Sequence, residues 1–201
     1  MDLGTTGPID CYLRRTDLVD FDHPLIQDYL RSNPSTGCSE EEIVKETFEF
    51  VRDDIAHSWD IQSDRVTAKA SDVLKYREGI CYAKSHLLAA LLRGMGIPTG
   101  FCYQKLVLSD KPEDGYAVHG LNTVYLRGAD KWIRLDARGN KPGVDAQFSI
   151  YEERLAFPVR AEMGEVDYLI NHADPHPKII ECLTQREKAS EMYRCGLPAE
   201  L

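Results

Sequence analysis

One stretch of this chain is apolar almost all round, and it limits the folds that the chain can adopt. Between Tyr82 and Arg93 the apolar positions are Ala83, Leu87, Leu88, Ala89, Ala90, Leu91 and Leu92. A helix with no polar face must be buried on most sides, so other segments have to surround it. Gly94 and Gly96 are expected to end this helix, with Pro98 beyond them. The stretch therefore predicts a central, buried helix.

Helical patterns also precede this stretch. Turn residues follow a short candidate helix over residues 24–31. Ser39 and Glu42 then have the spacing of a capping box, and apolar residues recur at helical spacing over about 40–57. Ser71 is expected to cap a short helix over the following five residues. The first half of the chain is thus predicted to be helical.

The pattern after the central helix favours strands. Residues 99–108, 117–126 and 131–137 are rich in β-branched, aromatic and other apolar residues, with turn residues between them. They predict an antiparallel sheet. A final helix over about 175–195, capped by Asp174, follows an irregular region. Helices followed by a sheet indicate the α+β class, with the central helix packed against the sheet.

Length and composition narrow the possible functions. The 201 residues are about the length of one domain, and no repeat or linker divides them, so we expect a single domain over 1–201. Lys and Arg total 24 against 33 acidic residues, a formal charge of -9. Phosphate binding needs a basic face, so we expect neither a nucleic-acid nor a membrane partner.

The six cysteines are expected to be reduced. No secretory leader and no run of 18 apolar residues is visible, which favours a cytoplasmic protein. The cysteines contain no C-x-x-C pair, which removes the usual zinc and thioredoxin-like signatures. We therefore expect no metal and no cofactor.

Cys81 stands where the central helix begins. A thiol attacks carbonyls as a thiolate, and the positive end of a helix dipole favours that charge. The unpaired backbone N–H groups of a first helical turn, including that of Cys81, can also hold an oxyanion. A lone cysteine before an apolar helix is, however, more often an inert core residue.

His119 and Asp136 lie on neighbouring predicted strands. A hairpin at residues 127–130 pairs positions whose numbers sum to 257, which puts Leu121 opposite Asp136. His119 and Asp136 then become diagonal neighbours on one face, so the carboxylate can orient the imidazole. His119 would accept the thiol proton and pass it to the leaving group. Taken singly, each residue has a plainer interpretation, as a core histidine and as a strand-end turn residue.

Three blocks of sequence resemble the transglutaminase-like superfamily. Residues 77–98, which begin REGICYAK, resemble its nucleophile helix. Residues 118–122 and 132–137 are similar to its later two blocks, and the resemblance covers about residues 40–140. It implies a papain-like core, with a catalytic triad of Cys81, His119 and Asp136.

The resemblance also suggests where the second oxyanion donor and the substrate lie. In this superfamily the histidine block commonly reads His-Ala-Trp, whereas Gly120 and Leu121 follow His119 here. A second oxyanion donor usually precedes the nucleophile, so Trp59 and Gln62 are candidates. Further candidates for substrate binding are Tyr82, Trp132, Arg138 and Asn140.

These features predict a cysteine enzyme that acts on an amide or isopeptide bond of a peptide or protein through a thioester. We expect hydrolysis rather than transfer to an amine, because a short chain shows no obvious second domain for a protein acceptor. Three alternatives stay open: a non-catalytic peptide-binding module, an arylamine N-acetyltransferase-like enzyme that uses acetyl-coenzyme A, and a metal or redox protein.

Overall fold

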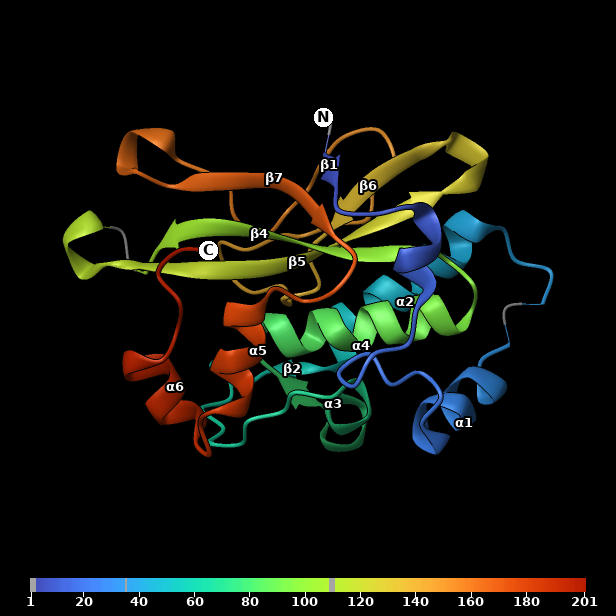
Figure 1. Cartoon of the computed structure of the whole chain (residues 1–201), viewed down its shortest axis with the longest axis horizontal. Coiled ribbons are helices and arrows are strands. Elements are labelled where there is room, and N and C mark those ends of the chain that lie inside the picture. The colour runs from blue at the N-terminus through green and yellow to red at the C-terminus, as the bar shows by residue number, and fades with distance from the viewer. Residues whose placement is uncertain (1–2, 35, 109–110) are drawn as a thin grey trace.

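The computed structural model describes residues 3–34, 36–108 and 111–201. It contains a mixed sheet with helices on one face. The helices lie below the sheet in the orientation of Figure 1. The sheet has the strand order β1-β7-β4-β5-β6. Its strands are β1 (Gly4–Thr5), β4 (Thr99–Val107), β5 (Tyr116–Leu126), β6 (Lys131–Leu135) and β7 (Val166–His172). The α+β class predicted from the sequence is confirmed.

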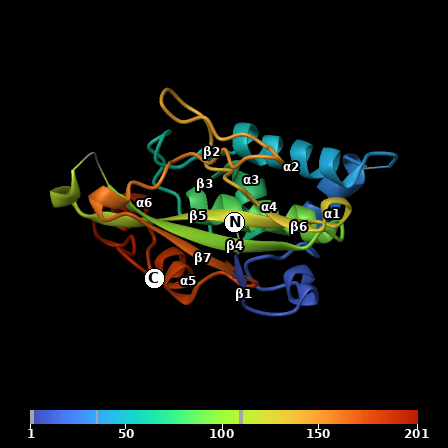
Figure 2. The same ribbon diagram turned by 90° about the horizontal axis from the view of Figure 1, so that it is seen from above.

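Most of the helices lie between β1 and β4 in the chain. They are α1 (Pro24–Ser32), α2 (Glu40–Asp54), α3 (Ala70–Tyr76) and α4 (Cys81–Gly94). Two further helices, α5 (Pro177–Thr184) and α6 (Ala189–Cys195), follow the sheet. Seen from above, α2 and α5 lie on either side of α4 (Figure 2). No helix within the described residues has both the length and the apolar character needed to cross a bilayer.

Helix α4 is the centre of the core, as its apolar pattern predicts. Every residue from Cys81 to Arg93 is buried. The two charged side chains of this helix are satisfied by backbone carbonyls. Lys84 donates to the carbonyls of Arg52, Ile55 and Arg138. Arg93 donates to those of Thr99, Arg14 and Ala173. Because each charge has several acceptors, the helix is buried without leaving an unpaired cation.

Two of the predicted helix boundaries are wrong, because tertiary pairing overrides local pattern. Helix α2 ends at Asp54, since Ala56 and His57 form strand β2 (Ala56–His57), parallel to β3 (Glu78–Gly79). Ser71 does not cap α3, whose N-cap is Lys69. The Ser71 hydroxyl instead donates to Asp20 Oδ2 at 2.6 Å.

The C-terminal part also differs from the prediction. Strand β7 lies in a segment expected to be irregular, and it pairs antiparallel with β4. The expected final helix is split into α5 and α6. His176, and not Asp174, caps α5 through its Nδ1, while Asp174 pairs with Arg14 at 2.9 Å. These pairings join residues far apart in the chain, which local patterns cannot reveal.

Candidate active site

The nucleophile candidate is the first residue of α4. Cys81 follows the N-cap Ile80, and strand β3 leads directly into it. A Cβ at Gly79 would lie 3.1 Å from both the Ala83 Cβ and the Thr67 Oγ1. Glycine at this position therefore lets β3 approach the helix closely. The first-turn N–H groups, including that of Cys81, have no acceptor within the helix. They form the positive end of the helix dipole.

The β5–β6 hairpin has the predicted register. Asn122 pairs with Leu135 and Thr123 with Arg134, so both pairs sum to 257. Strand β6 ends one residue before Asp136. His119 Nε2 lies 2.8 Å from Asp136 Oδ2, as expected for diagonal neighbours on one face.

Asp136 is fully enclosed and fully bonded. Its Oδ2 also accepts from the backbone N–H of Ala156 at 3.0 Å, and its Oδ1 from that of Arg138 at 3.2 Å. Burial favours the neutral carboxyl, but His119 and these N–H donors hold the pKa of Asp136 below its usual value. The carboxylate is thus charged and fixed in position.

The protonated form of His119 is favoured. Burial opposes the imidazolium, but the Asp136 carboxylate and then the Cys81 sulfur outweigh it and raise the pKa of His119 to about 10. Because Nε2 is engaged by Asp136, Nδ1 is the ring atom left for the thiol. The arrangement can hold a proton between a carboxylate and a sulfur at neutral pH.

Cys81 and His119 line one cleft of about 390 Å³. Most of its wall is apolar, and the ring of Phe157 meets that of His119 edge-on, 5.2 Å between centroids. The apolar lining residues are Trp59, Ile80, Leu106, Val107, Leu108, Ala117, Val118, Phe157 and Leu197. Such a cleft can hold an apolar group beside the thiol.

Charged side chains also line this cleft. Arg138 and Lys141 both bind the carboxylate of Asp60, and Lys141 Nζ lies 2.9 Å from Asp60 Oδ1. Arg160 pairs with Glu165 at 2.8 Å. The cleft therefore combines an apolar wall with ion pairs in which three cations share two carboxylates.

Three of the other site candidates lie at the cleft. Trp59 is half exposed there, and its ring packs against Tyr193 at 4.8 Å between centroids. Tyr82 and Arg138 also line the cleft, and both are buried. The Tyr82 hydroxyl donates to the carbonyl of Val118, the residue before His119.

The remaining three candidates are not among the residues that line the cleft. The side-chain amide of Gln62 donates to the Trp59 carbonyl at 2.5 Å. Trp132 packs against Tyr12, 4.7 Å between centroids. Asn140 bonds both the N–H and the carbonyl of Ala146, so it shapes the loop beyond Asp136.

The packing of Tyr82 accounts for the glycine after the candidate histidine. A Cβ at Gly120 would lie 2.8 Å from the Tyr82 Cδ1. The Tyr82 ring thus fills the space that an alanine side chain would need. Glycine in place of the alanine of His-Ala-Trp therefore leaves room for the large side chain of Tyr82, which follows Cys81.

Several cleft residues, among them His57 and Tyr193, are not predicted from the sequence. His57 and Tyr193 both line the cleft, from β2 and α6. The sequence pattern predicts His57 at the end of a helix and Tyr193 within the final helix. Only the pairing of β2 with β3 and the packing of α6 on Trp59 place them beside Cys81.

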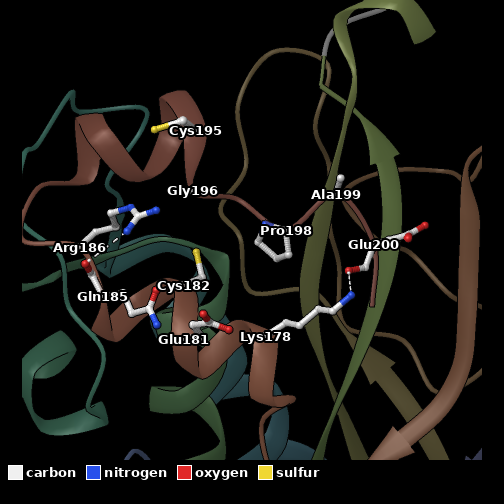
Figure 3. Close-up of a pocket in the computed structure, with 10 residues that line it drawn as sticks. All are labelled: Lys178, Glu181, Cys182, Gln185, Arg186, Cys195, Gly196, Pro198, Ala199 and Glu200. Atoms are coloured by element: carbon white, nitrogen blue, oxygen red, sulfur yellow. Dashed lines mark hydrogen bonds between the residues drawn. The ribbon is translucent and has the colours of Figure 1, made fainter.

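A second pocket lies between α5, α6 and the C-terminal segment (Figure 3). Cys182 and Cys195 both line it, and Lys178 Nζ donates to the carbonyl of Glu200 at 3.0 Å. Neither Cys81 nor His119 belongs to it. It is therefore separate from the candidate site.

The other cysteines have different surroundings from Cys81. All six are free thiols, and Cys102 is completely buried in β4, where burial raises the pKa of its thiol far above the usual value. Within the part of the chain that the structure describes, no three His, Cys, Asp or Glu side chains are grouped to hold a metal ion.

The family model of the transglutaminase-like superfamily matches residues 28–137, more than half of the chain. The comparison with curated proteins gave no match.

Two solved structures are similar to part of this chain. One is a "putative cysteine protease" from Cytophaga hutchinsonii, with 20% identity and a TM-score of 0.52 over 66% of this chain and 42% of that one. The other is a TGase, with 21% identity and a TM-score of 0.42 over 66% of this chain and 34% of that one. This chain thus spans less than half the length of either protein. On the family match, the chain belongs to the transglutaminase-like superfamily of cysteine enzymes.

Proposed function

We propose that this protein hydrolyses an amide or isopeptide bond of a peptide or protein through a thioester on Cys81. The supporting observation is the His119–Asp136 pair, 2.8 Å between Nε2 and Oδ2, whose His119 lines the same cleft as Cys81. Three separate elements of the chain supply these residues, and no structural role of a core cysteine needs that arrangement.

The first step forms the thioester. The Cys81 thiolate attacks the carbonyl carbon, a C–S bond forms and the carbonyl oxygen becomes an oxyanion. The His119 imidazolium gives its proton to the leaving nitrogen, the C–N bond breaks and an amine departs. Asp136 holds the ring in place throughout and stabilises its positive charge.

The second step consumes water. Neutral His119 takes a proton from a water molecule, whose oxygen attacks the thioester carbonyl. The C–S bond then breaks, the acid leaves and the Cys81 thiolate is restored. We favour water over an amine because a cleft of about 390 Å³, once filled by an acyl chain, has more room for water than for a second polypeptide.

The substrate side chain nearest the scissile bond is proposed to be apolar. The cleft wall beside Cys81 and His119 is formed by Leu106, Val107 and Phe157. Burying an apolar side chain against such a wall is favourable by ~25 cal/mol per Å². The cations at the cleft, Arg138, Lys141 and Arg160, are each paired with a carboxylate.

Alkylation by iodoacetamide tests whether Cys81 is activated. The rate is measured against pH, and the modified residue is located by mass spectrometry in wild type, His119→Ala and the control Cys195→Ser. We expect rapid labelling of Cys81 at pH 6 that His119→Ala abolishes and Cys195→Ser leaves unchanged. A Cys81 that reacts no faster than exposed Cys195 would contradict the enzyme and favour a peptide-binding module.

Product analysis tests the second step. A library of peptides with a blocked N-terminus is incubated with wild type or Cys81→Ser, with and without 10-fold excess glycine ethyl ester. Hydrolysis predicts free acids in wild type alone, and little ester product. Products that carry glycine ethyl ester instead would identify an acyltransferase.

A further inference from the structure

His57 is held beside the nucleophile by backbone pairing. Strand β2 is parallel to β3, and His57 pairs with Gly79, two residues before Cys81. The N–H of Ser58 donates to the Gly79 carbonyl at 3.2 Å. His57 lines the same cleft as Cys81 and His119. Its position relative to the start of α4 is therefore set by the sheet and not by a mobile loop.

The imidazole of His57 has no hydrogen-bond partner among the described residues. Its Nδ1 is buried and unpaired, and no described residue binds its Nε2. The two more deeply buried histidines are different: His86 Nδ1 lies 2.7 Å from the Ala68 carbonyl, and His119 binds Asp136. Most buried polar groups are paired, so an unpaired imidazole in a cleft indicates a partner that comes with the ligand.

The ring of His57 is neutral. Burial and then the nearby charge of Arg138 hold its pKa well below the usual value, against the opposing effect of Asp60. A neutral imidazole carries one N–H donor. Because a buried N–H without an acceptor is rare, the proton belongs on Nε2 and not on the buried Nδ1. His57 thus offers a donor without competing with His119 for the catalytic proton.

We propose that His57 is a catalytic residue whose Nε2–H, together with the backbone N–H of Cys81, hydrogen-bonds the oxyanion formed at the substrate carbonyl. This inference rests on the proposed function, because it needs acyl chemistry at Cys81. Trp59 is the rival donor. Its side chain is 50% exposed, whereas donors in a water-excluded site stabilise an oxyanion better.

Two reactions of the same thiol test this role. p-Nitrophenyl acetate acylates Cys81 through an oxyanion and releases p-nitrophenolate, whereas iodoacetamide alkylates it without one. Both rate constants are measured at pH 7 in wild type, His57→Ala, His57→Gln and Trp59→Phe. His57→Gln keeps an N–H donor, and Trp59→Phe removes the indole N–H while keeping an aromatic ring against Tyr193.

In His57→Ala we expect acylation to fall by at least about 10-fold, since removal of one oxyanion donor costs ~10²–10³ in kcat with demanding substrates. Alkylation should stay within about twofold, which also reports that the site is folded. His57→Gln should recover part of the loss, and Trp59→Phe should retain clearly more acylation than His57→Ala.

The remaining outcomes overturn the proposal in distinguishable ways. Equal acylation in wild type and His57→Ala, or a loss confined to Trp59→Phe, refutes the role of His57 alone. A parallel fall of acylation and alkylation in both His57 variants assigns it a structural role. Wild-type Cys81 that p-nitrophenyl acetate does not acylate refutes the proposed function itself, and the role of His57 with it.

Discussion

Replacing Asp136 by asparagine probes the centre of the candidate site with little change in volume. The carboxylate accepts three hydrogen bonds, from His119 Nε2 and from the N–H groups of Ala156 and Arg138. An asparagine has only one side-chain oxygen. Whichever way its amide is turned, the NH₂ group faces at least one of the two backbone N–H donors. One buried N–H therefore loses its acceptor.

The cost to stability follows from that lost acceptor. An unsatisfied buried donor costs ~1–3 kcal/mol. For a chain of this size, each kcal/mol lowers the Tm by about 2–4 °C. We therefore expect Asp136→Asn to fold, with a Tm reduced by roughly 2–12 °C.

The effect on reactivity is larger. The rise in the pKa of His119 from 6.5 to about 10 corresponds to roughly 5 kcal/mol in favour of the imidazolium. If Asp136 supplies about half of this preference, its removal costs ~2–3 kcal/mol. The population of the His119 imidazolium paired with the Cys81 thiolate then falls about 30- to 150-fold. We expect the rate of Cys81 alkylation at pH 6 to fall by on the order of 10²-fold.

The assay is the iodoacetamide rate at pH 6, with the labelled peptide quantified by mass spectrometry. Asp167→Asn is the matched control, because that carboxylate pairs with Arg134 and does not line the cleft. It should retain the wild-type rate. An Asp136→Asn protein that is folded and reacts within twofold of wild type would refute the coupling of Asp136 to the thiol through His119.

Three further predictions concern packing, pH and thiol access. Gly120→Ala should destabilise the protein by ~1–3 kcal/mol, measured by urea unfolding, since its Cβ would overlap Tyr82, whereas Gly128→Ala, with no atom within 4 Å, should be nearly neutral. His119→Gln should cost more stability at pH 6 than at pH 10. The raised pKa of folded His119 adds stability that is fully present below about pH 6.5 and is lost as the pH rises through about 10. Equal costs at both pH values would contradict this prediction. Cys102 should react with iodoacetamide only after unfolding, and labelling of Cys102 in the native protein would show that the β4 core is open.

The family match and the active-site geometry address different questions. The match to residues 28–137 ends at the residue after Asp136, so it covers all three triad candidates. The cleft, however, is completed by later residues, among them Phe157, Tyr193 and Leu197. Substrate preference is therefore expected to depend on the part of the chain that the family model does not cover.

The sequence alone determined the elements whose signal is local. The apolar pattern of α4, the capping box of Ser39 and Glu42 and the three strands are all present in the structure. The β5–β6 register was also predictable, because hairpin length and the two-residue period leave few alternatives. The juxtaposition of His119 and Asp136 follows directly from that register.

Only the tertiary structure decided the features that join distant segments. Pairing of β2 with β3 converted a predicted helix end into a strand and put His57 beside Cys81. Packing of α6 brought Tyr193 to Trp59, and Lys84 is held by three carbonyls that no local pattern connects. Local propensity is worth only tenths of a kcal/mol per residue, so burial and long-range hydrogen bonds decide wherever the two disagree.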